Sequence, residues 1–123
     1  MMRRLFQTIL IGALAVVAFD LIGSILSLAL GFDYTLLAFG SLVIYATVGI
    51  FASRDSVLFG PIAAGIVGLV DSTLGWYLSW VIGPGRVENL SVEIALWVIF
   101  FVTTEAAVTG LLGAIVARLV RAR

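Results

Sequence analysis

Four long apolar runs dominate the pattern of hydrophobic and polar positions along the chain. They cover residues 5–30, 34–53, 57–82 and 92–120, and short polar or glycine-rich stretches separate them. An α-helix needs roughly 20 apolar residues to cross a bilayer, and each run is about that long or longer. We therefore expect an all-α membrane protein. Its four transmembrane helices should form two tandem hairpins, packed as an up-down bundle in a single integral membrane domain over residues 1–123.

The separators predict where the chain turns. Gly31-Phe32-Asp33 is short enough to make the first two runs antiparallel neighbours. Arg54-Asp55-Ser56 divides the two hairpins, and its Asp or Ser is the expected cap of the third helix. Gly83-Pro84-Gly85 should end that helix, and Ser91 is the expected N-cap of the fourth.

Composition excludes a water-soluble fold. Of the 123 residues, 63% are hydrophobic and the mean hydropathy is +1.24, whereas soluble domains are roughly 45–50% apolar. Cysteine and histidine are both absent, which removes disulfides, thiolate nucleophiles and imidazole chemistry. The net charge of zero gives no sign of nucleic-acid binding. We expect the lipid bilayer as the main partner, no metal site and no cofactor.

The arginines predict the orientation of the chain. The first run is about twice as long as the apolar region of a signal peptide, and further spans follow it, so we expect it to be retained as a helix. By the positive-inside rule, both termini are expected to be cytoplasmic, in a cell membrane of the bacterial cytoplasmic type. Only Arg86 falls on the opposite side of a four-span arrangement from the other six: Arg3, Arg4, Arg54, Arg118, Arg121 and Arg123.

Three acidic residues fall near the middle of the bilayer. Asp71 lies ten residues after Pro61, which at 1.5 Å per residue is about 15 Å deep in a hydrocarbon core about 30 Å thick. Asp20 and Glu105 fall at nearly the same depth, and no Lys, Arg or His lies there to neutralise them. A charged carboxylate at a helix centre costs about 2.5–3.5 kcal/mol even on lenient scales. Hydroxyl side chains expected nearby are Ser24, Ser41, Tyr45, Ser72, Thr73 and Thr109.

Two interpretations of these acids stay open. They can form a proton or cation site, with Asp20, Asp71 and Glu105 as its ligands. Alternatively, each is a neutral acid that hydrogen-bonds across a helix pair and contributes about 0.5–2 kcal/mol to packing. Small residues on the same faces let helices approach closely, within the chain or between chains. The expected packing positions are Gly12, Gly23, Ala64, Gly68, Gly75, Gly110 and Gly113.

The two hairpins also resemble each other. Asp20 follows Arg4 at nearly the same distance as Asp71 follows Arg54, and residues 49–54 resemble residues 113–118. This pattern suggests an internal duplication with parallel units.

Two family resemblances follow from these features. In length, span number and the helix-one acid, the chain resembles the small multidrug resistance exporters, which implies that Asp20 matches their proton-exchanging glutamate. It departs from them by having Asp instead of Glu, two further midplane acids and a longer last loop. Over most of its length it is similar to small bacterial four-helix membrane proteins of unknown function, which end helix two with Gly-x-x-Ala-x-Arg, here Gly49 to Arg54.

No enzyme is expected. Intramembrane aspartyl proteases carry Tyr-Asp and Gly-x-Gly-Asp, but this chain has Phe19-Asp20 and Gly68-Leu69-Val70-Asp71. Phosphate loops and Ser-His pairs are also absent from the sequence. The expected function is a structural, assembly or partner subunit, in a homo-oligomer or with another membrane protein. The alternative is a proton- or cation-coupled transporter or channel that uses the three acids.

Overall fold

The computed structural model describes residues 2–123, and all regular structure in that range is helical. Four helical segments in it are long and apolar enough to span a membrane, which confirms the predicted fold class. Two of them are interrupted: the second begins with a 3₁₀ turn, and the third contains a π-helical turn. In chain order the elements are α1 (Met2–Leu30), η1 (Tyr34–Leu36), α2 (Leu37–Ala52), α3 (Phe59–Val70), η2 (Asp71–Gly75), α4 (Trp76–Ile82) and α5 (Val92–Arg121).

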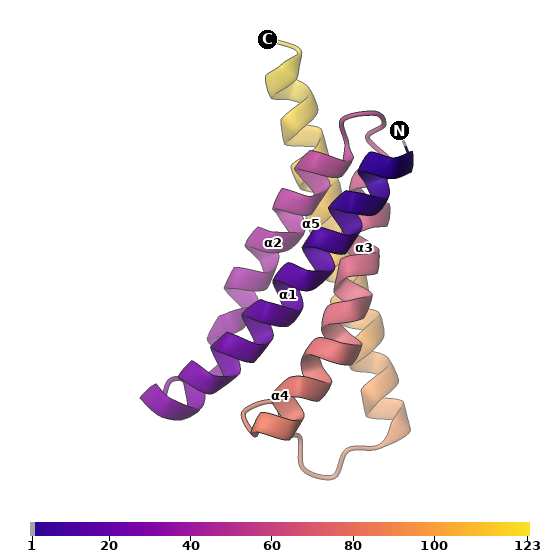
Figure 1. Ribbon diagram of the computed structural model, residues 1–123. Helices are drawn as coiled ribbons and strands as arrows, with labels where there is room; N and C mark the ends of the chain where they lie inside the picture. Colours follow the sequence, from indigo (N-terminus) through magenta and orange to yellow (C-terminus); the bar gives the residue numbers. More distant parts are fainter. Residues whose placement is uncertain (1) are drawn as a thin grey trace.

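The four spans run alternately up and down, so both ends of the chain lie at the same end of the bundle (Figure 1). The α2–α3 connection lies at this end as well, and we call it the terminal end. The α1–η1 and α4–α5 connections lie at the other end, the loop end. Arg4, Arg54 and Arg118 therefore gather at the terminal end, whereas Asp33 and Glu88 lie at the loop end.

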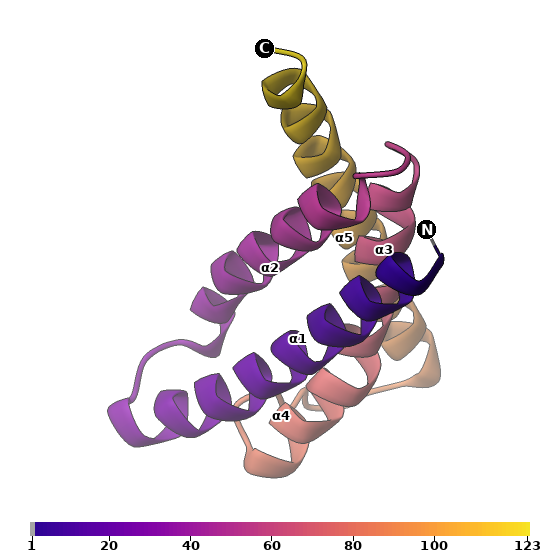
Figure 2. The same cartoon turned by 45° about the horizontal axis from the view of Figure 1, so that its top comes forward.

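The spans do not pack as a square. α2 and α3 pack against each other and both pack against α1 and α5, but within residues 2–123 no Cα atom of α1 lies within 8 Å of one in α5. The bundle thus has a central pair, α2 and α3, with one helix on either side of it. In Figure 2, as in Figure 1, the α1–α2 hairpin separates from α4 and α5 toward the loop end. Side chains from α1 and α5 can therefore meet only by reaching between α2 and the third span.

Small residues set the spacing of α3 and α5. Gly60 faces Ala114, Ala64 faces Gly110, and Gly68 faces Ala106. Each step is four residues forward on α3 and four residues back on α5, as an antiparallel pair of helical faces requires. Without larger side chains between them, the two backbones come close enough for dispersion contacts along the whole seam.

The helix ends follow the expected turn chemistry with one exception. Gly31 has a φ of +78° after α1, Gly83 has a φ of +134° after α4, and the Ser91 hydroxyl accepts a hydrogen bond from Ile94 N at 3.1 Å. Asp33 caps η1 by accepting hydrogen bonds from the backbone N–H and hydroxyl of Thr35, which hold the pKa of Asp33 below its usual range.

The exception is the start of the third span. Neither Asp55 nor Ser56 caps a helix there, because α3 begins at Phe59 and its N-cap residue, Leu58, makes no side-chain cap hydrogen bond. The Ser56 hydroxyl instead accepts from Leu58 N at 3.3 Å, within the turn. Pro61 occupies the first turn of α3, where its missing N–H leaves no intrahelical bond unmade.

Candidate functional site

Two of the three acids that were predicted to lie near the midplane meet inside the bundle. Asp20 on α1 and Asp71 at the start of η2 are both buried. A Cβ placed on Gly75 would collide with the Asp20 Oδ2 atom and lie 2.9 Å from the Asp71 Oδ1 atom. The two carboxyl groups therefore flank the same glycine, and only a residue without a side chain leaves room for both.

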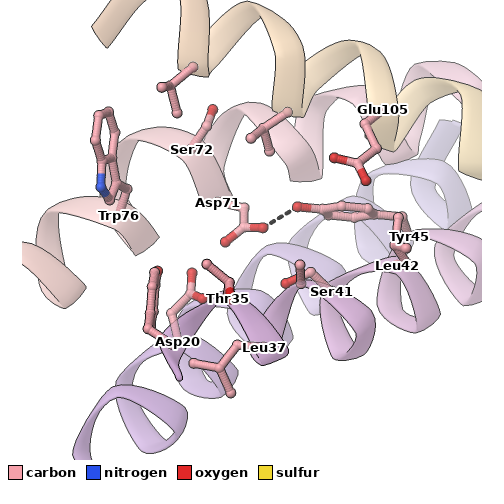
Figure 3. Close-up of a pocket in the computed structure, with 14 residues that line it drawn as sticks. Asp20, Thr35, Leu37, Ser41, Leu42, Tyr45, Asp71, Ser72, Trp76 and Glu105 are labelled. Carbon is pink, nitrogen blue, oxygen red and sulfur yellow. Dashed lines mark hydrogen bonds between the residues drawn. The ribbon is translucent and has the colours of Figure 1, made fainter. Parts of the chain in front are cut away.

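The hydrogen bonding of the two acids differs. The Tyr45 hydroxyl on α2 donates a hydrogen bond to Asp71 Oδ2 (Figure 3). Asp20 is only 4% exposed, and its Oδ2 atom has no hydrogen-bond partner among the described residues. A buried polar atom without a partner costs about 1–3 kcal/mol, more if it is charged. The pair therefore contains one acceptor position that a proton or a cation would satisfy.

All four spans line a cavity of about 250 Å³ around these acids. Glu105 reaches into it from α5 toward the ring of Tyr45, so the three predicted acids share one cavity (Figure 3). Ser41 and Ser72 contribute hydroxyls to the wall. Apolar and aromatic side chains complete the lining; they include Leu37, Ala38, Leu42, Trp76, Val98 and Val102.

The π-helical turn η2 places Asp71 at the cavity. Trp76 N donates to the Asp71 carbonyl, five residues back, so the helix is locally wider than an α-helix. The hydroxyl of Thr73 donates to the Leu69 carbonyl at 2.7 Å, next to this turn. Single π-helical turns within α-helices occur frequently at functional sites. Here the turn carries the acid and the glycine between the two carboxyl groups.

The cavity has different surroundings toward the two ends of the bundle. Toward the loop end its lining includes Tyr34 and Thr35 of η1. One helical turn toward the terminal end from Asp20, Tyr45 and Asp71 lies an apolar layer of Val16, Val48 and Val67, all buried. The last two close around Gly12, where an added Cβ would lie 2.6 Å from Val48 and 2.9 Å from Val67. The acids are therefore separated from the terminal end by packed side chains.

A chain of hydroxyls lies on the loop-end side of Asp20. Ser24, one turn further along α1, shares a hydrogen bond of 2.7 Å with Ser79 of α4. The Tyr34 hydroxyl, in turn, accepts a hydrogen bond of 2.8 Å from Ser79. These bonds tie α1, α4 and η1 together beside the cavity. Ser79 was missed by the sequence analysis, although the spacing Asp71, Gly75, Ser79 places it on the same helical face.

The other predicted residues lie in two kinds of position. Thr73 and Thr109 are outside the cavity lining, and their hydroxyls donate to carbonyls of their own helices, which is a common alternative for a threonine inside a helix. The predicted small residues lie at close helix contacts. Gly12 lies against α2 and α3, Gly23 against Leu37, Gly75 against the two acids, Gly113 against the Ala46 backbone, and Ala64, Gly68 and Gly110 along the α3–α5 seam.

Some close glycine contacts were not predicted, and those of Gly49 and Gly60 involve the α5 helix. A Cβ on Gly49 would collide with the backbone of Gly110, and one on Gly60 would lie 2.5 Å from the Ala114 side chain. Gly49 was noted in the sequence only as part of the helix-two ending. Gly49 is recognised as a packing position only by its contact with Gly110 of α5, and the sequence of α2 alone does not show that contact.

The protein is a small polytopic membrane protein with four candidate spans and a buried acidic cavity. No protein-family model matches the chain, and the search found neither a curated protein nor a solved structure that matches it. The resemblances to small bacterial four-helix proteins and to small multidrug resistance exporters therefore stay predictions.

Proposed function

We propose that the protein is a proton- or cation-coupled membrane transporter whose binding site is the Asp20 and Asp71 pair, with Glu105 as a third acid. The observation that supports this best is the buried Asp20 Oδ2 atom, which has no hydrogen-bond partner within residues 2–123 and lies beside a second carboxyl group. Two adjacent carboxylates repel each other strongly in a medium of low dielectric constant. A proton or a small cation removes that repulsion and satisfies the unpaired oxygen.

The surroundings of the site support a mechanism in which a proton or cation reaches the acids from one side of the membrane at a time. In this conformation the cavity extends toward the loop end until it reaches residues of η1. The layer of Val16, Val48 and Val67 separates the cavity from the terminal end. Transport then requires a second conformation in which this layer opens. The π-helical turn is a suitable hinge, because its wider backbone can convert to α-helix with a change of register.

The test is flux in liposomes that hold the purified protein and a pH-sensitive dye. With a potassium diffusion potential as driving force, the unmodified protein should move protons across the liposome membrane. If transport is coupled to sodium, proton movement should appear when a sodium gradient is applied. Asp71→Asn keeps an acceptor for Tyr45 but cannot titrate, so flux should fall to that of empty liposomes. Glu88→Gln, which removes an exposed acid at the loop end, should retain full flux. Equal flux for Asp71→Asn and the unmodified protein would rule out this site.

An assembly or partner subunit is the second candidate. It is favoured by the Tyr45–Asp71 bond and the Ser24–Ser79–Tyr34 chain, which connect helices in the way that polar groups stabilise membrane bundles. This function predicts no flux from any variant. It predicts instead a homo-oligomer or a complex with another membrane protein that persists in mild detergent.

The proposed orientation places both termini in the cytoplasm, because six of the seven arginines lie at or near the terminal end. A peptide tag between Gly85 and Asn89 should then be accessible to a membrane-impermeant label in intact cells. Tags at either terminus should be labelled only after permeabilisation. Labelling of a terminal tag in intact cells would reverse the orientation.

A further inference from the structure

A second cavity opens at the terminal end, between α1 and α2 and away from the acids. Its volume is about 220 Å³, and its lining includes Arg4 and Arg54 together with the polar side chains of Gln7 and Thr8. The guanidinium of Arg54 lies 5.3 Å from the centre of the Phe51 ring, a cation–π contact that holds it beside the cavity. Asp55 also lines the cavity, so the two arginines leave one net positive charge there.

An apolar groove continues from this cavity along the outside of α1 and α2. Its volume is about 430 Å³, and it shares Thr8, Ile11 and Phe51 with the basic cavity. Its rim is open to the surroundings, since Ile11 is 67% exposed and Val43 is 65% exposed. The remaining lining is small or apolar and consists of Gly12, Ala15, Ile44, Thr47 and Val48.

The dimensions match one leaflet of a bilayer. From Arg4 to Ala15 along α1 there are eleven residues, or about 16 Å at 1.5 Å per residue. Half of a hydrocarbon core about 30 Å thick is about 15 Å. The groove therefore begins at the level of the headgroups and ends near the midplane, where the buried layer at Val16 begins.

From these features we infer that the α1–α2 groove binds one anionic phospholipid, with its phosphate held by Arg4 and Arg54 and one acyl chain lying along Ile11, Ala15 and Val43. A guanidinium suits a phosphate because it donates several parallel hydrogen bonds in a planar fork. The charge at one end and the apolar wall along the rest of the groove favour a lipid over a soluble anion or another helix. A transmembrane helix in the groove would pair with this positive charge only if it carried an acidic residue at the same level.

Native mass spectrometry of the delipidated protein with added lipid tests this site. Phosphatidylglycerol should bind more tightly than phosphatidylcholine of the same chain length. The double variant Arg4→Gln with Arg54→Gln should weaken phosphatidylglycerol binding roughly tenfold or more, on the basis of about 1 kcal/mol per basic residue near an anionic lipid surface. The matched control, Arg118→Gln with Arg123→Gln, removes two charges from the same end outside the cavity and should leave the affinity nearly unchanged.

A second pair of variants tests the groove. Thr47→Phe fills the groove and should weaken lipid binding, whereas Val108→Phe, on the exposed face of α5, should not. Glycerol phosphate, which has the anion without the chains, should not compete at the same concentration. Effective competition by glycerol phosphate would reduce the site to an anion site and overturn the inference. A change of oligomeric state in Thr47→Phe, with lipid binding intact, would assign the groove to a second copy of the chain and overturn it as well.

Discussion

Gly49→Ala should destabilise the bundle by about 1–3 kcal/mol or more, although it adds one methyl group. The new Cβ would lie 2.6 Å from the Gly110 Cα and 2.7 Å from its carbonyl carbon, so it would meet backbone rather than a movable side chain. α5 cannot shift away from α2, because on its other side Gly110 already packs against Ala64, and the Gly60 carbonyl would be 2.8 Å from a Cβ at position 110. Three helices would have to separate to admit the methyl group.

The measurement is unfolding by sodium dodecyl sulfate in mixed micelles, followed by circular dichroism. Gly65→Ala is the matched control, since its Cβ would find only the Ala107 Cβ at 3.5 Å, an ordinary contact. We expect that variant to be unchanged or slightly more stable, because alanine is the better helix former. Equal unfolding curves for the two variants would show that α2 and α5 do not approach closely at Gly49 and Gly110.

Asp71→Leu should lose about 1–2 kcal/mol of stability, because the buried Tyr45 hydroxyl is left without its acceptor. Asp71→Asn keeps an acceptor oxygen and a similar size, so it should fold normally. Tyr45→Phe should also cost stability, and adding it to Asp71→Leu should cost little more, since the interaction is then already lost. The same unfolding assay gives the four values of this double-mutant cycle.

The outcome separates two roles of the same residue. A coupling energy near zero between Tyr45 and Asp71 would mean that their hydrogen bond does not hold α2 to the third span. A normal stability of Asp71→Asn, together with a loss of proton flux, would assign Asp71 a functional role beyond packing. Ser24→Ala breaks only the neighbouring hydroxyl chain, and its effect should add to that of Asp71→Leu if the two networks are independent.

The close approach of α3 and α5 explains why so short a chain can hold buried acids. Large side chains at a helix contact hold the two helix axes further apart, whereas small residues let the backbones approach. Here Gly60, Ala64 and Gly68 bring α3 against α5, and the larger side chains of Val16, Val48 and Val67 fill the space beside α1. The acids lie one turn from this tightly packed layer, in a cavity on the side where the α1–α2 hairpin separates from α4 and α5.

The sequence by itself determined the membrane class, the four spans and the turns at Gly31 and Gly83. Each of these depends on properties of one segment: its length, its hydropathy, or the conformational freedom of a glycine. The helical pattern of Asp71 with Gly75 even indicated which face of the third span turns inward. These features are local, so the sequence of each segment contains all the information needed to predict them.

Only the tertiary structure decided which side chains meet. Whether Tyr45 or Thr109 faces Asp71 depends on the rotation and axial register of two helices, and hydropathy alone constrains neither quantity closely. The sequence did not predict the π-helical turn at Asp71 either, because the length and hydropathy of the span indicate a helix but not the hydrogen-bond register inside it. The same holds for Gly49, whose importance lies in the Gly110 backbone opposite it. The central pairing of α2 with α3, which keeps the backbones of α1 and α5 apart, follows from the sum of such helix contacts and from no single segment.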